Sequence, residues 1–166
     1  MALDNLFLTK LTKSDFPQYY LLVGNEQVMA MITEKALSIQ EAEKGFEKIL
    51  NGNALHPDFG FYKITDSISG NFLGVVKLEI EKQAPKEAEL GYMILPEHWG
   101  KGIGGKVSEM MLNKARLSDV LEKITAIIDP KNIASRKILI NNGFHSLEFK
   151  DFDDLPGEIL VLNLTP

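Results

Sequence analysis

The segment HWGKGIGGKV, from His98 to Val107, packs four glycines and two lysines into ten residues. Glycine loses more backbone entropy on folding than any other residue, so this cluster is costly unless bare backbone is needed there. A run typical of a strand ends just before it, at Leu95, and an amphipathic run follows it. The pattern predicts a strand, a loop and a helix whose unshielded N–H groups form an anion site, with Lys101 and Lys106 adding positive charge.

Two nucleotide-binding patterns and one purely structural explanation also fit these glycines. The G-x-x-x-x-G-K start of a triphosphate loop is present, but Val107 stands where that loop needs a Ser or Thr for magnesium. The G-x-G-x-x-G dinucleotide fingerprint is present too, but it turns directly off its strand, whereas residues 96–99 intervene here. Too little chain remains to complete a doubly wound sheet. The structural explanation is a tight loop with close helix packing.

The remaining pattern predicts a mixed sheet with helices rather than a regular alternation of strands and helices. Ser38 and Asn132 are expected N-caps, because each stands just before a helical run. A helix stop is expected at residues 51–53, and a turn at residues 156–157. The expected strands are 6–12, 60–65, 71–80, 87–95, 124–128, 144–149 and 159–164, and the expected helices are 19–23, 39–50, 104–117 and 133–141.

The composition is that of one globular domain, residues 1–166. A chain of this length can bury one core, and no apolar run approaches the roughly 18 residues that span a bilayer. The N-terminus lacks a signal-peptide pattern, so we expect a cytoplasmic protein without a membrane partner. The net charge of -5 argues against nucleic-acid binding. With no cysteine and three scattered histidines, no metal site is expected.

Three ordered segments carry a family resemblance: Glu89 to Gly104, Asp129 to Ser135, and Asn142 to Phe144. Together they resemble the GNAT superfamily of acetyl-CoA-dependent N-acetyltransferases. The family's pyrophosphate loop reads Q/R-x-x-G-x-G/A, and Trp99, Gly102 and Gly104 stand at its three defined positions. The tryptophan, the Asn-x-x-Ser after the next strand and the early segment GNEQVM resemble the branch of ribosomal-protein N-terminal (alanine/serine) acetyltransferases.

The resemblance implies an α/β (α+β) GNAT fold. Its central mixed, mostly antiparallel sheet has about seven strands, is flanked by about four helices, and is splayed where acetyl-CoA, the implied co-substrate, binds. The family's pantetheine arm lies in the splay, where a main-chain N–H such as that of Ile94 can polarise the thioester. No metal is implied. The cofactor-binding residues expected on this basis are Met93, Ile94, Trp99, Gly100, Lys101, Gly102, Ile103, Gly104, Gly105 and Asn132.

Direct attack of an amine on the thioester needs a base for the ammonium and a proton for the departing thiolate. Glu89, on the strand beside the reacting centre, is the expected base, directly or through a water, with His98 as an alternative. Many GNAT enzymes place a tyrosine four residues after the serine of Asn-x-x-Ser, but Leu139 stands there. By analogy with the branch that the sequence resembles, Ser135 is the expected proton donor, unless the thiolate leaves unprotonated.

The acceptor is expected beyond the thioester, walled by the helical segment from Val28 to Ile32. Met29, Met31 and Ile32 offer adaptable apolar surface there, although core residues would show the same pattern. The expected reaction is acetyl transfer to a primary amine, with a protein N-terminus favoured and a polyamine or aminoglycoside as alternatives. A further alternative is an acyl-CoA-binding or sensing module without turnover. A monomer and a homodimer both fit the sequence.

Overall fold

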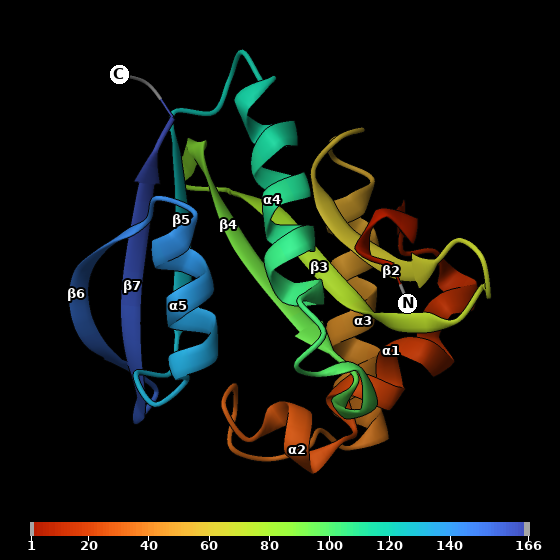
Figure 1. Ribbon diagram of the computed structural model, residues 1–166. Coiled ribbons are helices and arrows are strands. Elements are labelled where there is room, and N and C mark those ends of the chain that lie inside the picture. Colours follow the sequence, from red (N-terminus) through yellow and green to blue (C-terminus); the bar gives the residue numbers. More distant parts are fainter. Residues whose placement is uncertain (1, 165–166) are drawn as a thin grey trace.

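One seven-stranded sheet runs through the molecule (Figure 1). The computed structural model describes residues 2–164, and within them the strand order is β1-β2-β3-β4-β5-β7-β6. The central pair, β4 with β5, is parallel, and the other neighbouring pairs are antiparallel. This confirms the expected mixed, mostly antiparallel sheet. The strands are β1 (Leu6–Lys10), β2 (Gly60–Asp66), β3 (Phe72–Glu81), β4 (Ala84–Ile94), β5 (Lys123–Ile128), β6 (His145–Phe152) and β7 (Leu155–Asn163).

Helices cover both faces of this sheet. In Figure 1, α4 and α5 lie in front of it, and α1 and α3 lie behind it. Alternate residues of β3 enter the two layers: Val76 and Leu78 pack in the cluster that contains α4, and Val75 packs with α1 and α3. The helices of the described residues are α1 (Phe16–Val23), α2 (Glu26–Met29), α3 (Ile39–Asn53), α4 (Ile103–Arg116) and α5 (Ile133–Asn141).

The two central strands lie side by side at one end and part at the other. Residues 87–89 of β4 pair with residues 123–125 of β5, and among the residues described the pairing stops there. β4 itself runs on to Ile94, with β3 still paired to its other edge. The edge of β4 that faces β5 is therefore unpaired from Leu90 onward, as expected for a splayed sheet.

α3 ends at Asn53, within the stop expected at residues 51–53 but later than the expected last helical residue, Leu50. The Asn53 side chain donates to the main-chain carbonyls of Leu11 and Phe61 and accepts a hydrogen bond from the Phe61 N–H. These bonds tie the last turn of α3 to β2 and outweigh the low helix propensity of Asn and Gly. Ser38 caps the other end as expected, and Glu41 completes a capping box.

The last hairpin turns earlier than the sequence predicts. Asp153 and Asp154 have positive φ angles of 47° and 66°, which a tight hairpin turn needs and Asp tolerates. The turn expected at Pro156 and Gly157 is therefore wrong, because both residues pair with β6 as part of β7. The single-turn helix α2 also adds one helix to the four that the periodicity predicts.

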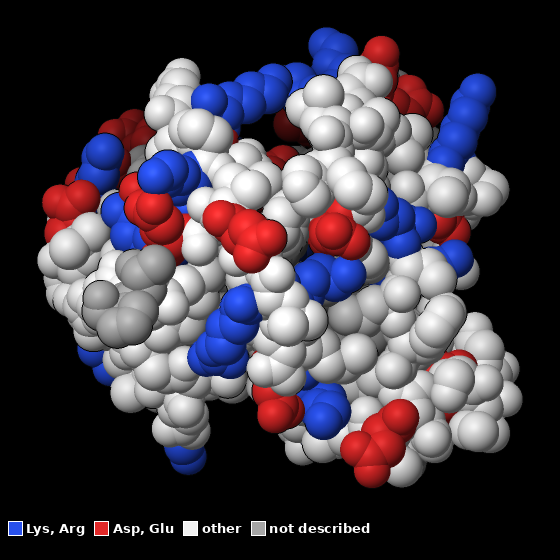
Figure 2. Space-filling model, turned by 90° about the horizontal axis from the view of Figure 1, so that it is seen from above, with Lys and Arg blue, Asp and Glu red and all other residues white. Residues whose placement is uncertain are grey.

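The surface mixes both signs of charge at the end of the molecule that lies at the top of Figure 1. Figure 2 views this end and shows lysines interspersed with acidic residues. Two ion pairs, Lys86–Glu122 (2.7 Å) and Lys123–Glu87 (2.6 Å), join the beginnings of β4 and β5. Within residues 2–164, no helix combines the length and the apolar character that crossing a bilayer requires.

Candidate active site

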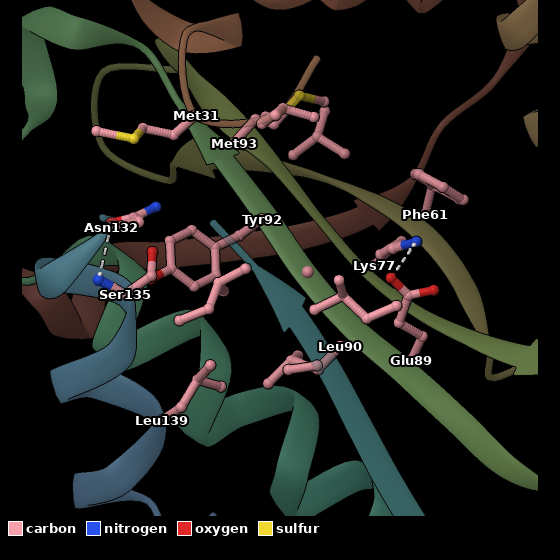
Figure 3. Close-up of a pocket in the computed structure, with 16 residues that line it drawn as sticks. Met31, Phe61, Lys77, Glu89, Leu90, Tyr92, Met93, Asn132, Ser135 and Leu139 are labelled. Atoms are coloured by element: carbon pink, nitrogen blue, oxygen red, sulfur yellow. Dashed lines mark hydrogen bonds and ion pairs between the residues drawn. The ribbon is translucent and has the colours of Figure 1, made fainter. Parts of the chain in front are cut away.

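A pocket of about 270 Å³ opens where β4 and β5 part (Figure 3). Its walls come from β4 between Glu89 and Met93, the end of β5, the first turns of α5, and the segment that follows α2. β2 and β3 contribute Phe61, Val75 and Lys77. The lining therefore combines apolar side chains with few polar groups, as is typical of small-molecule sites.

The glycine-rich loop runs directly into α4, next to the end of β4. Gly102 is the N-cap of α4, with a left-handed φ of 82°, and no side chain caps this helix end. The first N–H groups of a helix have no acceptor within the helix, so those of Ile103, Gly104 and Gly105 remain available to an anion. The Trp99 indole donates to the Ile94 carbonyl at 2.8 Å, which ties the loop to the last residue of β4.

Gly104 and Gly105 serve different purposes. A Cβ at position 104 would lie 2.9 Å from the Tyr92 ring and 3.3 Å from Ile138, so this glycine allows a close contact between α4, β4 and α5. A Cβ at position 105 would meet no protein atom within 4 Å. No contact in the described structure therefore requires the second glycine, and the bare backbone at the start of α4 fits an anionic group such as a pyrophosphate.

The main chain at the end of β4 presents donors to the gap. The Leu95 N–H donates to Leu73 in β3, and successive residues of a strand point their main-chain groups to opposite sides. Ile94 and Tyr92 therefore direct theirs toward β5, into the gap. Met93 lines the pocket with its side chain, whereas Ile94 and the loop 99–105 lie outside the lining.

Glu89 lies in the pocket and forms an ion pair. Its Oε1 is 3.2 Å from the Lys77 Nζ, and the Glu89 side chain is 21% exposed (Figure 3). Glu87, two residues earlier, pairs instead with Lys123. The structure therefore distinguishes the two carboxylates: Glu89 belongs to the pocket. Lys77 is not predicted from the sequence, because its place beside Glu89 depends on the register between β3 and β4.

Ser135 meets a second hydroxyl inside the pocket. The Tyr92 Oη lies 2.9 Å from the Ser135 Oγ, and Asn132 caps α5 by accepting from the Ser135 N–H at 3.1 Å. Burial raises the pKa of the Tyr92 hydroxyl, and the bond to Ser135 opposes that rise less strongly. Tyr92 therefore stays protonated at neutral pH. Tyr92 is not among the residues predicted from the sequence. Its side chain points to the same face of β4 as those of Leu90 and Ile94, because alternate residues of a strand share a face, and this spacing could have indicated an inward-facing hydroxyl.

The segment after α2 supplies part of the expected acceptor wall. Met31 and Ile32 are partly exposed and line the pocket. Met29 does not: it is 3% exposed and packs in the cluster with α1 and α3, so the structure places it in the core. His98, the alternative base, lies in the short turn before the loop, outside the lining, and its buried Nδ1 has no partner among the described residues.

Within residues 2–164, no three His, Cys, Asp or Glu side chains gather in a way that could hold a metal ion. Two groups of polar side chains line the pocket. One is the ion pair of Glu89 with Lys77, and the other is the pair of hydroxyls from Tyr92 and Ser135. Glu89 and Tyr92 both lie on β4, and the N-terminus of α4 lies next to the end of this strand.

Residues 5–145 match the family described as the acetyltransferase (GNAT) domain. YoaA, an uncharacterized N-acetyltransferase of Bacillus subtilis (strain 168), is 24% identical over 143 residues, which are 85% of this chain and 80% of that protein. A spermidine N-acetyltransferase from Vibrio cholerae, solved with CoA and spermine, is 20% identical, with a TM-score of 0.80 over 97% of this chain and 96% of that one. An aminoglycoside acetyltransferase solved with coenzyme A is 14% identical, with a TM-score of 0.79 over 95% and 94%.

Proposed function

This chain belongs to the GNAT acetyltransferase family, and from that membership we propose that it transfers an acetyl group from acetyl-CoA to a primary amine. The observation that carries the proposal is the parting of β4 and β5 directly beside an uncapped helix N-terminus. The gap suits an extended arm, and the helix end suits a pyrophosphate. Two proteins of the same fold were solved with CoA, which also supports this choice of co-substrate.

Acetyl-CoA supplies an acetyl group activated as a thioester. The N–H groups of Ile103 to Gly105 are proposed to bind the pyrophosphate, with Lys101 and the other residues of the loop from Trp99 around it. The Ile94 N–H is proposed to donate to the thioester carbonyl, where charge develops during attack. Donors of this kind are worth about 3–4 kcal/mol in other enzymes. Asn132 completes the set at the start of α5.

We assign proton transfer to one carboxylate, that of Glu89, and one hydroxyl, that of Ser135. Glu89 takes a proton from the acceptor ammonium, directly or through a water, so that the amine has a lone pair for attack. When the C–S bond breaks, its electron pair stays on sulfur, and the Ser135 hydroxyl is the proposed proton donor to it. The Tyr92 and Ser135 hydroxyls lie within hydrogen-bond distance. We propose that Tyr92 is the donor of this bond, because the Ser135 hydrogen is then free for the sulfur.

The first candidate acceptor is a protein N-terminal amine, as in the ribosomal-protein branch that the sequence resembles. Met31, Ile32 and Phe61 form an apolar wall that suits the first side chains of a peptide. Because the pocket opens to the surface beside the partly exposed Met31 and Ile32, a peptide can extend away from it.

A polyamine is the second candidate, and a specific observation favours it. Four carboxylates lie together on β3 and β4: Glu79, Glu81, Glu87 and Glu89. Burial raises the pKa of Glu81, and repulsion from the other three, led by Glu89, raises it further. Lys77 opposes this rise, and Lys77 and Lys123 form ion pairs with Glu79, Glu89 and Glu87. The four carboxylates still outnumber these two lysines, and the excess negative charge favours an acceptor with additional ammonium groups.

An acceptor panel tests the proposal and separates the two classes. Release of CoA thiol is measured with N-terminal peptides that begin with Ala or Ser, with spermidine and spermine, and with an aminoglycoside. We expect saturable release with one class, and a peptide preference would support the first candidate. Tight CoA binding without release above hydrolysis for every amine would overturn the enzymatic proposal and leave a binding or sensing module.

A further inference from the structure

Lys77 reaches the pocket by crossing over β4. Its strand, β3, pairs with β4 so that Lys77 stands opposite Gly91. A Cβ at position 91 would lie 3.1 Å from the Lys77 Cε and 3.5 Å from its Cγ. The missing side chain at Gly91 therefore makes room for the Lys77 stem, which lies over β4 at this residue.

The end of this side chain is a primary amine held beside the proposed base. The Lys77 Nζ lies 3.2 Å from Glu89 and 3.6 Å from Glu79, and 5.6 Å from the centre of the Phe61 ring. The Lys77 side chain is 22% exposed and lines the same pocket as Met31 and Ile32. An acceptor ammonium that approaches Glu89 therefore competes with the Lys77 ammonium for the same carboxylate.

We propose that Lys77 is an internal acceptor, so that without an amine substrate the protein acetylates its own Lys77 Nζ. This inference rests on the proposed function, because it uses the same acetyl donor and the same base. The ammonium gives one proton to Glu89, and the amine then attacks the thioester carbonyl. The new N–C bond replaces the C–S bond, and the sulfur leaves as thiolate. The second proton that the nitrogen loses as the amide forms balances the proton that the thiolate takes up, and the first proton passes from Glu89 to water.

The modification limits itself and responds to substrate. An acetylated Lys77 carries no charge, so its ion pair with Glu89 is lost and the acetyl group fills the acceptor half of the pocket. A bound acceptor ammonium pairs with Glu89 in place of Lys77, and its presence at the site protects Lys77 from acetylation. Self-acetylation is therefore expected to be fastest without acceptor and to slow the transfer to amines added later.

Lys63 provides a matched internal control. It lies on β2, its side chain is 23% exposed, and it is ion-paired with Asp15 at 2.8 Å. Chemical acetylation by exposure alone would modify Lys63 and Lys77 at similar rates. Acetylation that depends on the pocket would select Lys77.

The experiment incubates the protein with acetyl-CoA and no amine, cleaves it at glutamate, and follows the acetyl group on each lysine by mass spectrometry. We expect Lys77 to be acetylated faster than Lys63 by roughly tenfold or more, because its amine is held at the site. Glu89→Gln should slow the Lys77 reaction, and so should a saturating acceptor. A short acetyl thioester without the pyrophosphate should show no preference for Lys77.

Equal rates at Lys77 and Lys63, or the same Lys77 rate in urea-unfolded protein, would overturn the inference. Unmodified Lys77 in a preparation that acetylates amines would also overturn it and leave the proposed function standing. If no added amine is acetylated but Lys77 is, the inference holds and the assigned acceptors are wrong.

Discussion

Glu89 is distinguished from other strand carboxylates by where its side chain lies, in the pocket and against Lys77. If Glu89 is the base, Glu89→Gln should lower kcat by about 10²- to 10⁴-fold, the usual range for general-base catalysis. CoA affinity should not change, because the loop is untouched. Steady-state kinetics and calorimetry measure the two quantities. Glu87→Gln, which removes a carboxylate paired with Lys123, is the control and should keep most of the rate. An unchanged rate at every pH in Glu89→Gln would remove the assignment.

The Tyr92 hydroxyl is expected to act through Ser135 rather than on the substrate. Tyr92→Phe should reduce kcat roughly threefold to tenfold, the equivalent of one hydrogen bond of about 1 kcal/mol, with the KM for acetyl-CoA unchanged. In a Ser135→Ala background the same change should have little further effect. Tyr62→Phe is the control, because Tyr62 also loses a buried hydroxyl bond, to Asp58 at 2.7 Å. Additive losses from Tyr92 and Ser135 would contradict the coupling.

Asp15 is a buried carboxylate that joins the start of α1 to β2. Although its burial opposes ionisation, hydrogen bonds from Lys63 and from the Thr12 N–H hold the pKa of Asp15 below its usual value. A lowered pKa contributes stability that is present above about pH 4, the unfolded value, and is lost as the pH falls through the folded value. Asp15→Asn should cost about 3 kcal/mol at pH 7 in urea unfolding, and less near pH 3. A similar loss from the exposed Asp119→Asn, or an equal cost at both pH values, would contradict this account.

Capping residues predict where helices begin, whereas contacts between residues separated in the sequence account for the features that are not predicted. Asn132 caps α5 as expected, because an N-cap needs only its neighbours in sequence. The helical conformation of Asn53 is not predicted, because its amide is bonded to the main chain of Leu11, just after β1, and of Phe61 in β2. The same division holds at the site. The loop, Glu89 and Ser135 follow from sequence patterns, whereas Tyr92 and Lys77 depend on strand register.

Two neighbouring glycines in the first turn of α4 are expected to have different roles, Gly104 in packing and Gly105 in ligand binding. Gly104→Ala brings a Cβ against the Tyr92 ring, so we expect a lower melting temperature and disturbed kinetics. Gly105→Ala meets no protein atom and should raise stability by about 0.4–1 kcal/mol, since alanine favours a helix. CoA affinity should nevertheless fall in Gly105→Ala, because its Cβ enters the space proposed for the pyrophosphate. Thermal unfolding and CoA titration measure both effects. Unchanged CoA affinity in Gly105→Ala would place the pyrophosphate elsewhere.

At the scale of the whole molecule, the sheet explains why one strand carries so much of the site. β4 is paired with β3 along its length but with β5 only at residues 87–89, so its far half presents main chain and side chains to a gap. α4 begins where β4 ends, and α5 covers the other side of the gap. The proposed donor site, base and proton donor therefore all lie on or beside β4, α4 and α5.

Acetyl transfer is measured most directly by its two products, the acetylated amine and free CoA thiol. The protein is incubated with acetyl-CoA and the amine that the panel selects, and mass spectrometry counts the acetylated amine against free CoA thiol. We predict equal amounts of the two, formed at a rate that falls in Glu89→Gln. Thiol formed without any acetylated product, at the rate seen in the absence of the protein, would contradict the account.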